Sequence, residues 1–210
     1  MSRPINQAEK YDQYLNRLIE DAQRLDADFR NFTKLWSLLD DYLDEVNEAP
    51  GTFMSIINAF RTSTVVLAHR LFDARSDVVS LHELIRIADT HGGVIDWKGG
   101  RLSSQDLDAQ RNRITAYQDP LDRLRKQRNK AYAHLDKKHV LNREAFAQDF
   151  PLVDKDLRGA IELAHNVLQE HHGARFNSHL EMRIVNAVNV KHLLELVRIG
   201  RKYRKTELFS

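Results

Sequence analysis

The sequence contains no cysteine and little proline or glycine. Of its 210 residues, 4 are proline and 8 are glycine. Without cysteine the chain can form no disulfide framework, no thiolate zinc site and no cysteine nucleophile. Proline and glycine are the residues that most often interrupt regular structure, so their scarcity favours long helices over a turn-rich β fold. These absences predict an all-α protein.

Long apolar runs and glycine-rich phosphate loops are missing as well. No stretch approaches the roughly 20 apolar residues that span a bilayer, and the N-terminal residues contain no apolar segment of the kind found in secretory signals. We therefore expect a cytoplasmic protein with no membrane partner. The glycine pairs at 92–93 and 99–100 match neither GxxxxGK[ST] nor GxGxxG, so we expect no nucleotide cofactor there.

The length and composition fit one soluble domain, which we expect to cover residues 1–210. Hydrophobic residues make up 42% and charged residues 30% of the chain, which is ordinary for a globular protein. The formal net charge of +2 is too small to indicate nucleic-acid binding by itself. The local distribution of charge therefore decides this question.

Apolar residues at spacings of three and four predict helices along most of the chain. The expected helices cover residues 7–31, 32–48, 53–73, 80–90, 103–117, 119–136, 152–172 and 187–199. Thr52, Ser80 and either Ser103 or Ser104 are suitable N-caps, and Glu83 and Asp106 could complete capping boxes. Glycines at 173 and 200 are expected to end the last two helices. Residues 174–186 are weaker in pattern and could hold one short extended piece.

The stretch from Pro120 to Asp136 carries the strongest signals. Asp119 can cap a helix there, and Pro120 fits the first helical position. Four apolar residues keep helical spacing: Leu121, Leu124, Ala131 and Leu135. Arg128 falls in the same stripe, where a charge is costly unless something pairs with it. Arg128 therefore either extends to solvent or faces a partner, a site or a dimer seam.

His134 follows Arg128 by six residues, which on an ideal helix places it about 120° around the axis. One rigid helix therefore does not present both side chains on a narrow face. A long arginine, a helix that ends near His134, or a second copy of the chain could each complete a site.

Arg128-Asn129, followed after four residues by His134, resembles the signature of the HEPN superfamily. In that signature an arginine, usually followed by a polar residue, precedes a histidine by four to six residues. The surrounding text LRKQRNKAYAHLDKK is similar to the abortive-infection U-type (AbiU-like) branch. So is the earlier run AHRLFD at 68–73 with Ser80-Leu81, and the resemblance is most specific over about residues 60–140. It implies a HEPN-type helical bundle with additional flanking helices.

The resemblance also implies a function, metal-independent cleavage of RNA at a composite site shared by a homodimer. A histidine with a pKa near 6.5 can act as base or acid, and an arginine can stabilise phosphate charge. In the family's division of labour Arg128 and His134 are catalytic and Asn129 assists. We expect a role in phage defence or as a toxin, with an antitoxin or defence-system partner. The alternative is a non-catalytic bundle that binds RNA or nucleotide, or serves as a dimeric scaffold.

Basic residues around the motif could follow an RNA backbone, although a solvated helix surface would have the same composition. The candidates are Arg125, Lys126, Lys130, Lys137 and Lys138. Three further residues could support the site. Asp136 could orient His134 or pair with Lys137, Tyr132 could stack on a base or lie in the core, and Asp73 could pair with the motif helix or serve its own loop.

Other features of the chain have structural alternatives. His69, near the end of an expected helix, could be a packing or capping residue or a catalytic one. The His171-His172 pair fits a solvated helix end better than a metal site, since adjacent helical residues point in different directions. HEPN toxins that are neutralised by nucleotidyltransferases carry a tyrosine two residues after the motif histidine. Here that position is Asp136, which argues against this mode of neutralisation.

Overall fold

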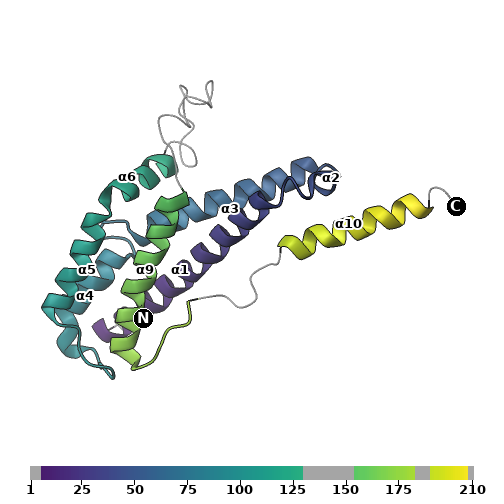
Figure 1. Ribbon diagram of the computed structural model, residues 1–210. Coiled ribbons are helices and arrows are strands. Elements are labelled where there is room, and N and C mark those ends of the chain that lie inside the picture. Colours follow the sequence, from purple (N-terminus) through teal and green to yellow (C-terminus); the bar gives the residue numbers. More distant parts are fainter. Residues whose placement is uncertain (1–5, 130–153, 183–189, 208–210) are drawn as a thin grey trace, which may run out of the picture.

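The computed structural model describes residues 6–129, 154–182 and 190–207, and all regular structure in these ranges is helical (Figure 1). The elements are α1 Gln7–Ser37, α2 Leu43–Val46, α3 Pro50–Leu71, α4 Leu81–His91, the 3₁₀ turn η1 Gly92–Val94, α5 Ser104–Ala116, α6 Gln118–Gln127, α9 Asp154–Phe176 and α10 Val190–Glu207. The prediction of an all-α bundle is confirmed. None of the helices in these ranges has the length and apolar character of a membrane span.

Helix α1 is the axis of the bundle, with α3 packed along it and α4, α9 and α10 in contact with it. A capping box between Asn6 and Glu9 fixes its start. We allowed for a helix boundary near Asn31, but α1 continues to Ser37. The apolar face continues across this point, since Phe29 before it and Leu35 after it are both buried. Packing therefore keeps the helix intact.

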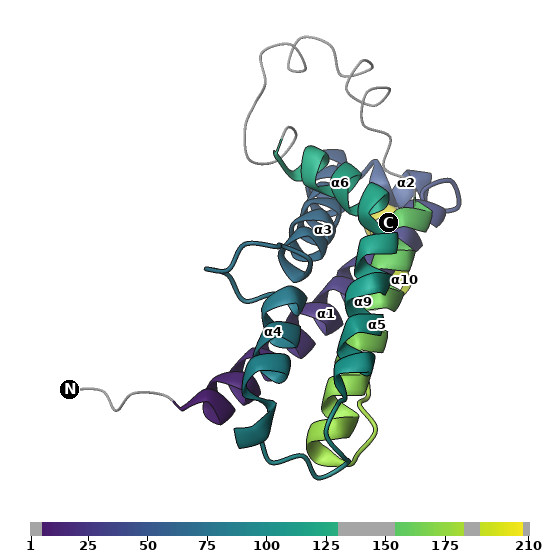
Figure 2. The same cartoon turned by 90° about the vertical axis from the view of Figure 1, so that its left-hand side faces the viewer.

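Two apolar clusters hold the helices together. The larger lies between α1, α4, α5, α6, α9 and the second half of α3, and the smaller joins the end of α1 to α2, the first half of α3 and α10. Each fully buried aliphatic or aromatic side chain contributes roughly 1.5–3 kcal/mol of transfer free energy. In Figure 2, α5 and α9 run side by side along one flank of the larger cluster.

A buried polar chain links α1, α5 and α9 inside the larger cluster. The Tyr11 hydroxyl lies 2.8 Å from His171 Nδ1, and His171 Nε2 lies 2.9 Å from Gln110 Oε1. Gln110 Nε2 donates to Glu170 at 2.8 Å, and Arg113 donates to the same oxygen at 2.6 Å. Since Gln110 Oε1 can only accept, His171 Nε2 carries the proton and Nδ1 accepts from Tyr11.

The placement of His171 corrects our expectation of a solvated helix end. His171 is 0% exposed, because α9 continues through Gly173 for another turn to Phe176. The loop that follows η1 explains the extension. The amides of Lys98 and Gly99 donate to the carbonyls of Arg175 and Ala174, so the last turn of α9 gains backbone partners from another segment.

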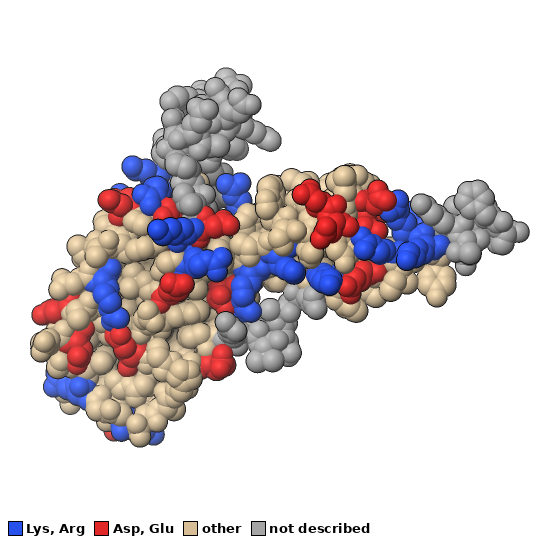
Figure 3. Space-filling view, viewed as in Figure 1, with Lys and Arg blue, Asp and Glu red and all other residues tan. Residues whose placement is uncertain are grey.

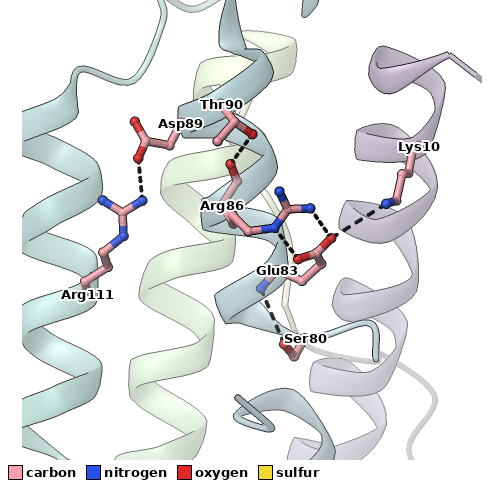
Figure 4. A network of polar contacts seen from close by, with 7 residues as sticks. All are labelled: Lys10, Ser80, Glu83, Arg86, Asp89, Thr90 and Arg111. Atoms are coloured by element: carbon pink, nitrogen blue, oxygen red, sulfur yellow. Dashed lines mark hydrogen bonds and ion pairs between the residues drawn. The ribbon is translucent and has the colours of Figure 1, made fainter. Parts of the chain in front are cut away.

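Ion pairs on the flank of α4 join it to its neighbours (Figure 4). Glu83 accepts from Arg86 at 2.6 Å and lies 3.6 Å from Lys10 of α1. Arg111 of α5 donates to Asp89 at 2.7 Å. Ser80 caps α4 as predicted by accepting from the Glu83 amide, but the Glu83 side chain is used by Arg86 and Lys10 and does not complete the capping box.

Three other helix boundaries differ from the sequence prediction. Helix α3 begins at Pro50 and not after Thr52, because proline suits the first helical turn. Helix α6 begins at Gln118 without a side-chain cap, since Tyr117 both ends α5 and starts α6. Helix α10 passes through Gly200 to Glu207.

The extension of α10 is held against α2 by ion pairs. Arg198 pairs with Glu45 at 3.0 Å, and Arg201 pairs with Asp44 at 2.8 Å. Arg204 also lies 3.0 Å from Glu48, two residues beyond the end of α2. Figure 3 shows acidic and basic side chains next to each other over the part of the molecule where α2 and α10 lie. The contacts of Arg201 and Arg204 stabilise the part of α10 beyond Gly200, where we expected the helix to have ended.

Candidate functional site

The motif residues Arg128 and Asn129 directly follow the last residue of α6. Leu121 and Leu124 are buried against the core, as predicted from the apolar stripe. The next buried position is Gln127, which is 1% exposed, whereas Arg128 is only half-buried. Arg128 therefore lies at the edge of the stripe, where its guanidinium can reach a cavity.

Arg128 and Asn129 line a cavity of about 510 Å³ between α3, the turn after it, α4 and α6. The ionisable side chains around it are His69, Asp73, Arg75, His82, Asp122, Arg125 and Arg128. An adjoining cavity of about 390 Å³ is also lined by Arg128 and extends to Arg17 and Asp21 of α1. His69, Asp73, Arg75 and Arg128 border both cavities. These four residues form the centre of the candidate site.

The two carboxylates of the larger cavity are each held by an arginine other than Arg128. Asp73 accepts from the Arg75 guanidinium at 3.0 Å and from the Arg75 backbone amide at 3.1 Å. Asp122 lies 3.2 Å from Arg125. Arg128 instead donates to the neutral Asn129 Oδ1 at 2.6 Å. Arg128 therefore has no carboxylate partner among residues 6–129, 154–182 and 190–207, so within these ranges its positive charge is available to bind an anion.

Asp73 occupies the position expected of a support residue but pairs within its own loop. Burial works to raise the pKa of its carboxyl, yet the hydrogen bonds from Arg75 outweigh burial and the pKa is lowered. Asp73 is therefore ionised at neutral pH. Its ion pair is with Arg75 and not with a basic residue of α6, which fits the loop role that we weighed as the alternative.

Two histidines face the larger cavity, His69 near the end of α3 and His82 in the first turn of α4. Burial lowers the pKa of the His69 imidazole, and the positive charge of Arg128 lowers it further, while Asp73 opposes both. Burial also lowers the pKa of His82, again opposed by Asp73. Both imidazoles are therefore neutral at pH 7 and able to accept a proton.

The structure describes only part of the predicted site. It brings Arg125, Arg128 and Asn129 into one cavity with Asp73, and it places Lys126 as an exposed residue in the last turn of α6. Several predicted residues lie outside the described ranges: Lys130, Tyr132, His134, Asp136, Lys137 and Lys138. Figure 3 shows basic side chains mixed with acidic ones around the end of α6.

Sequence reasoning did not single out Arg75 and His82 as members of this cavity. Arg75 lies four residues after the end of α3, and His82 lies in the first turn of α4. No motif spacing in the sequence connects either residue to Arg128. The signal that could have indicated them is the resemblance of 68–73 and 80–81 to the AbiU-like branch, because these residues flank the cavity. In residues 6–129, 154–182 and 190–207, no group of three or more His, Asp or Glu side chains could hold a metal ion.

Comparison with known families agrees with the motif and the fold. The family model HEPN_AbiU2, described as AbiU2, matches residues 8–195, which include every described helix except the ends of α1 and α10. No curated protein and no solved structure is similar enough to the chain to count as a match. The resemblance read from residues 60–140 thus extends over most of the sequence. The chain belongs to the AbiU2 family of HEPN domain proteins.

Proposed function

We propose that this protein is a metal-independent endoribonuclease that uses Arg128, Asn129 and His134. The observation that carries the proposal is the position of Arg128. Its guanidinium borders two adjoining cavities and is held by a neutral amide, while the cavity's carboxylates are bound to other arginines. A phosphate could enter this cavity without displacing an existing ion pair of Arg128 with Asp73 or Asp122.

The proposed reaction is transesterification at the ribose. The 2′-oxygen loses its proton to a base and forms a bond to phosphorus, while the bond from phosphorus to the 5′-oxygen breaks. An acid donates a proton to that 5′-oxygen, so the products carry a 2′,3′-cyclic phosphate and a 5′-hydroxyl. Arg128 would stabilise the added negative charge on the phosphate oxygens, and His134 would transfer a proton. Since a guanidinium supplies the positive charge, the reaction has no need of a metal ion.

Membership of the AbiU2 family supports a role in abortive infection, as a toxin acting in phage defence. We further propose that two protomers bring their motifs together across a dimer seam, since one helix does not present Arg128 and His134 on a single face. Light scattering at micromolar concentration should then give twice the mass of the chain. A monomer would exclude the two-motif site.

The test is cleavage of a mixed RNA pool in EDTA by the wild type, Arg128→Ala and His134→Ala. Arg24→Ala is the matched control, because Arg24 is an exposed arginine of α1 that borders neither cavity. We expect losses of about 100-fold or more for the two motif variants, with cyclic-phosphate ends in the wild-type products, and no loss for the control.

The other outcomes are equally informative. Equal cleavage by all four proteins would place the activity elsewhere or in a contaminant. No cleavage by the wild type would refute the nuclease and favour a bundle that binds RNA or nucleotide, or serves as a scaffold.

A further inference from the structure

His69 is the histidine most closely associated with Arg128 in the described chain. It borders both cavities that Arg128 borders, whereas His82 borders only the larger one. The Arg128 charge acts directly on the His69 imidazole, and for His82 the charge that acts is that of Asp73. His69 lies on α3 and Arg128 just beyond α6, and these two helices pack against each other. The juxtaposition is therefore set by the core of the bundle.

The charged groups around His69 come from four elements. On α3 its neighbour Arg70 is held by Asp21 of α1. The turn after α3 contributes Asp73 and Arg75, which pair with each other, and α6 contributes Arg125, which pairs with Asp122. Arg128 adds a positive charge that is not paired with Asp21, Asp73 or Asp122, since its side-chain partner is Asn129. The surroundings therefore favour a neutral imidazole beside a site for a phosphate.

We propose that His69 is a catalytic residue of the same reaction, the base that takes the proton from the ribose 2′-hydroxyl while Arg128 holds the phosphate. This rests on the proposed nuclease function. The reaction needs two proton transfers, and His69 borders both of the cavities that Arg128 borders, where it can accept the first proton. With His69 as base, the 2′-oxygen bonds to phosphorus while the bond from phosphorus to the 5′-oxygen breaks. The acid of the proposed reaction donates a proton to that 5′-oxygen, and water returns both groups to their starting forms.

The assignment predicts a particular pH dependence. A base must be unprotonated, and burial and Arg128 lower the pKa of His69 below its ordinary value of 6.5. The acidic limb of the wild-type rate should therefore have its midpoint below pH 6.5. In His69→Gln we expect a rate about 100-fold lower at pH 7 and the loss of this acidic limb. The alkaline limb, which belongs to the acid, should remain.

His165→Gln is the matched control. His165 is also a half-buried histidine on a long helix, and burial also lowers the pKa of its imidazole, but it borders neither cavity. Its substitution should leave the rate and both limbs unchanged. If His69→Gln keeps the wild-type rate, or loses rate but keeps the acidic limb, the catalytic role is overturned while the nuclease stands. If the wild type cleaves no RNA, the nuclease itself fails and the role of His69 fails with it.

A second measurement uses the wild-type protein and does not depend on the folding of a variant. A single-stranded RNA pool with 2′-O-methyl groups at every position cannot undergo the reaction but can occupy the site. We expect it to shift the NMR signals of the His69 ring and to leave those of His165 in place. Binding that leaves the His69 signals unmoved would overturn the proposal.

Discussion

The buried imidazole of His171 should make the stability of this protein depend on pH in the mildly acidic range. His171 is 0% exposed, and burial lowers its pKa from 6.5 to about 3. Its two ring nitrogens are already used, one accepting from Tyr11 and the other donating to Gln110. Protonation would place a charge in this apolar interior, where the described hydrogen-bond partners of His171 include no carboxylate, and this is unfavourable.

The sign follows from the two pKa values. In the unfolded chain the imidazole binds a proton below pH 6.5, whereas in the folded protein it stays neutral down to about pH 3. Within this window the unfolded state holds more protons, so the free energy of unfolding falls as pH falls. At about 1.4 kcal/mol per pH unit, the contribution of His171 between pH 7 and pH 5 is a loss of about 2 kcal/mol.

The assay is urea unfolding of the wild type and His171→Gln at both pH values. A glutamine can accept from Tyr11 and donate to Gln110 without titrating, so the variant should lose about 2 kcal/mol less than the wild type between pH 7 and pH 5. His179→Gln replaces an exposed histidine and should behave like the wild type. The reasoning is refuted if wild type and His171→Gln lose the same free energy.

Two further predictions concern the loop beside α9 and the start of α5. Gly99→Ala should destabilise the fold by about 1–3 kcal/mol, because the new Cβ would lie 2.1 Å from the Gly173 carbonyl oxygen. Gly93→Ala is the control and should not destabilise the fold, because its Cβ would have no atom within 4 Å. Thermal unfolding compares the two variants, and equal midpoints would contradict the packing described for this loop. Ser103→Ala should lower the free energy of unfolding by about 1 kcal/mol, because it removes the capping box of α5. Ser104→Ala is the control and should change the free energy of unfolding by less than about 0.5 kcal/mol. Denaturant titration measures both, and equal effects would argue against the cap.

Local patterns sufficed for the features that depend on neighbouring residues. The scarcity of glycine and proline and the spacing of apolar residues predicted an all-α bundle, and Ser80 and Ser103 start α4 and α5 as their capping chemistry indicates. The motif around Arg128 pointed to the HEPN family, which the family match confirms. The apolar stripe of α6 was also readable, since Leu121 and Leu124 are buried.

Contacts between distant segments decided the rest. A glycine at 173 is a stop signal by itself, yet α9 continues because the amides of Lys98 and Gly99 supply partners for its last carbonyls. His171 looked like a surface residue until Tyr11 and Gln110, more than 60 residues away along the chain, enclosed it.

The candidate site shows the same division between local and distant information. The sequence by itself identified the residues of the motif, because Arg128 and Asn129 are adjacent. The proximity of His69 and Arg75 to Arg128 depends on how α3, α4 and α6 pack, and side-chain burial across that packing sets the charge state of His69. No local pattern encodes this arrangement, since the three helices meet only when the apolar core between them is formed.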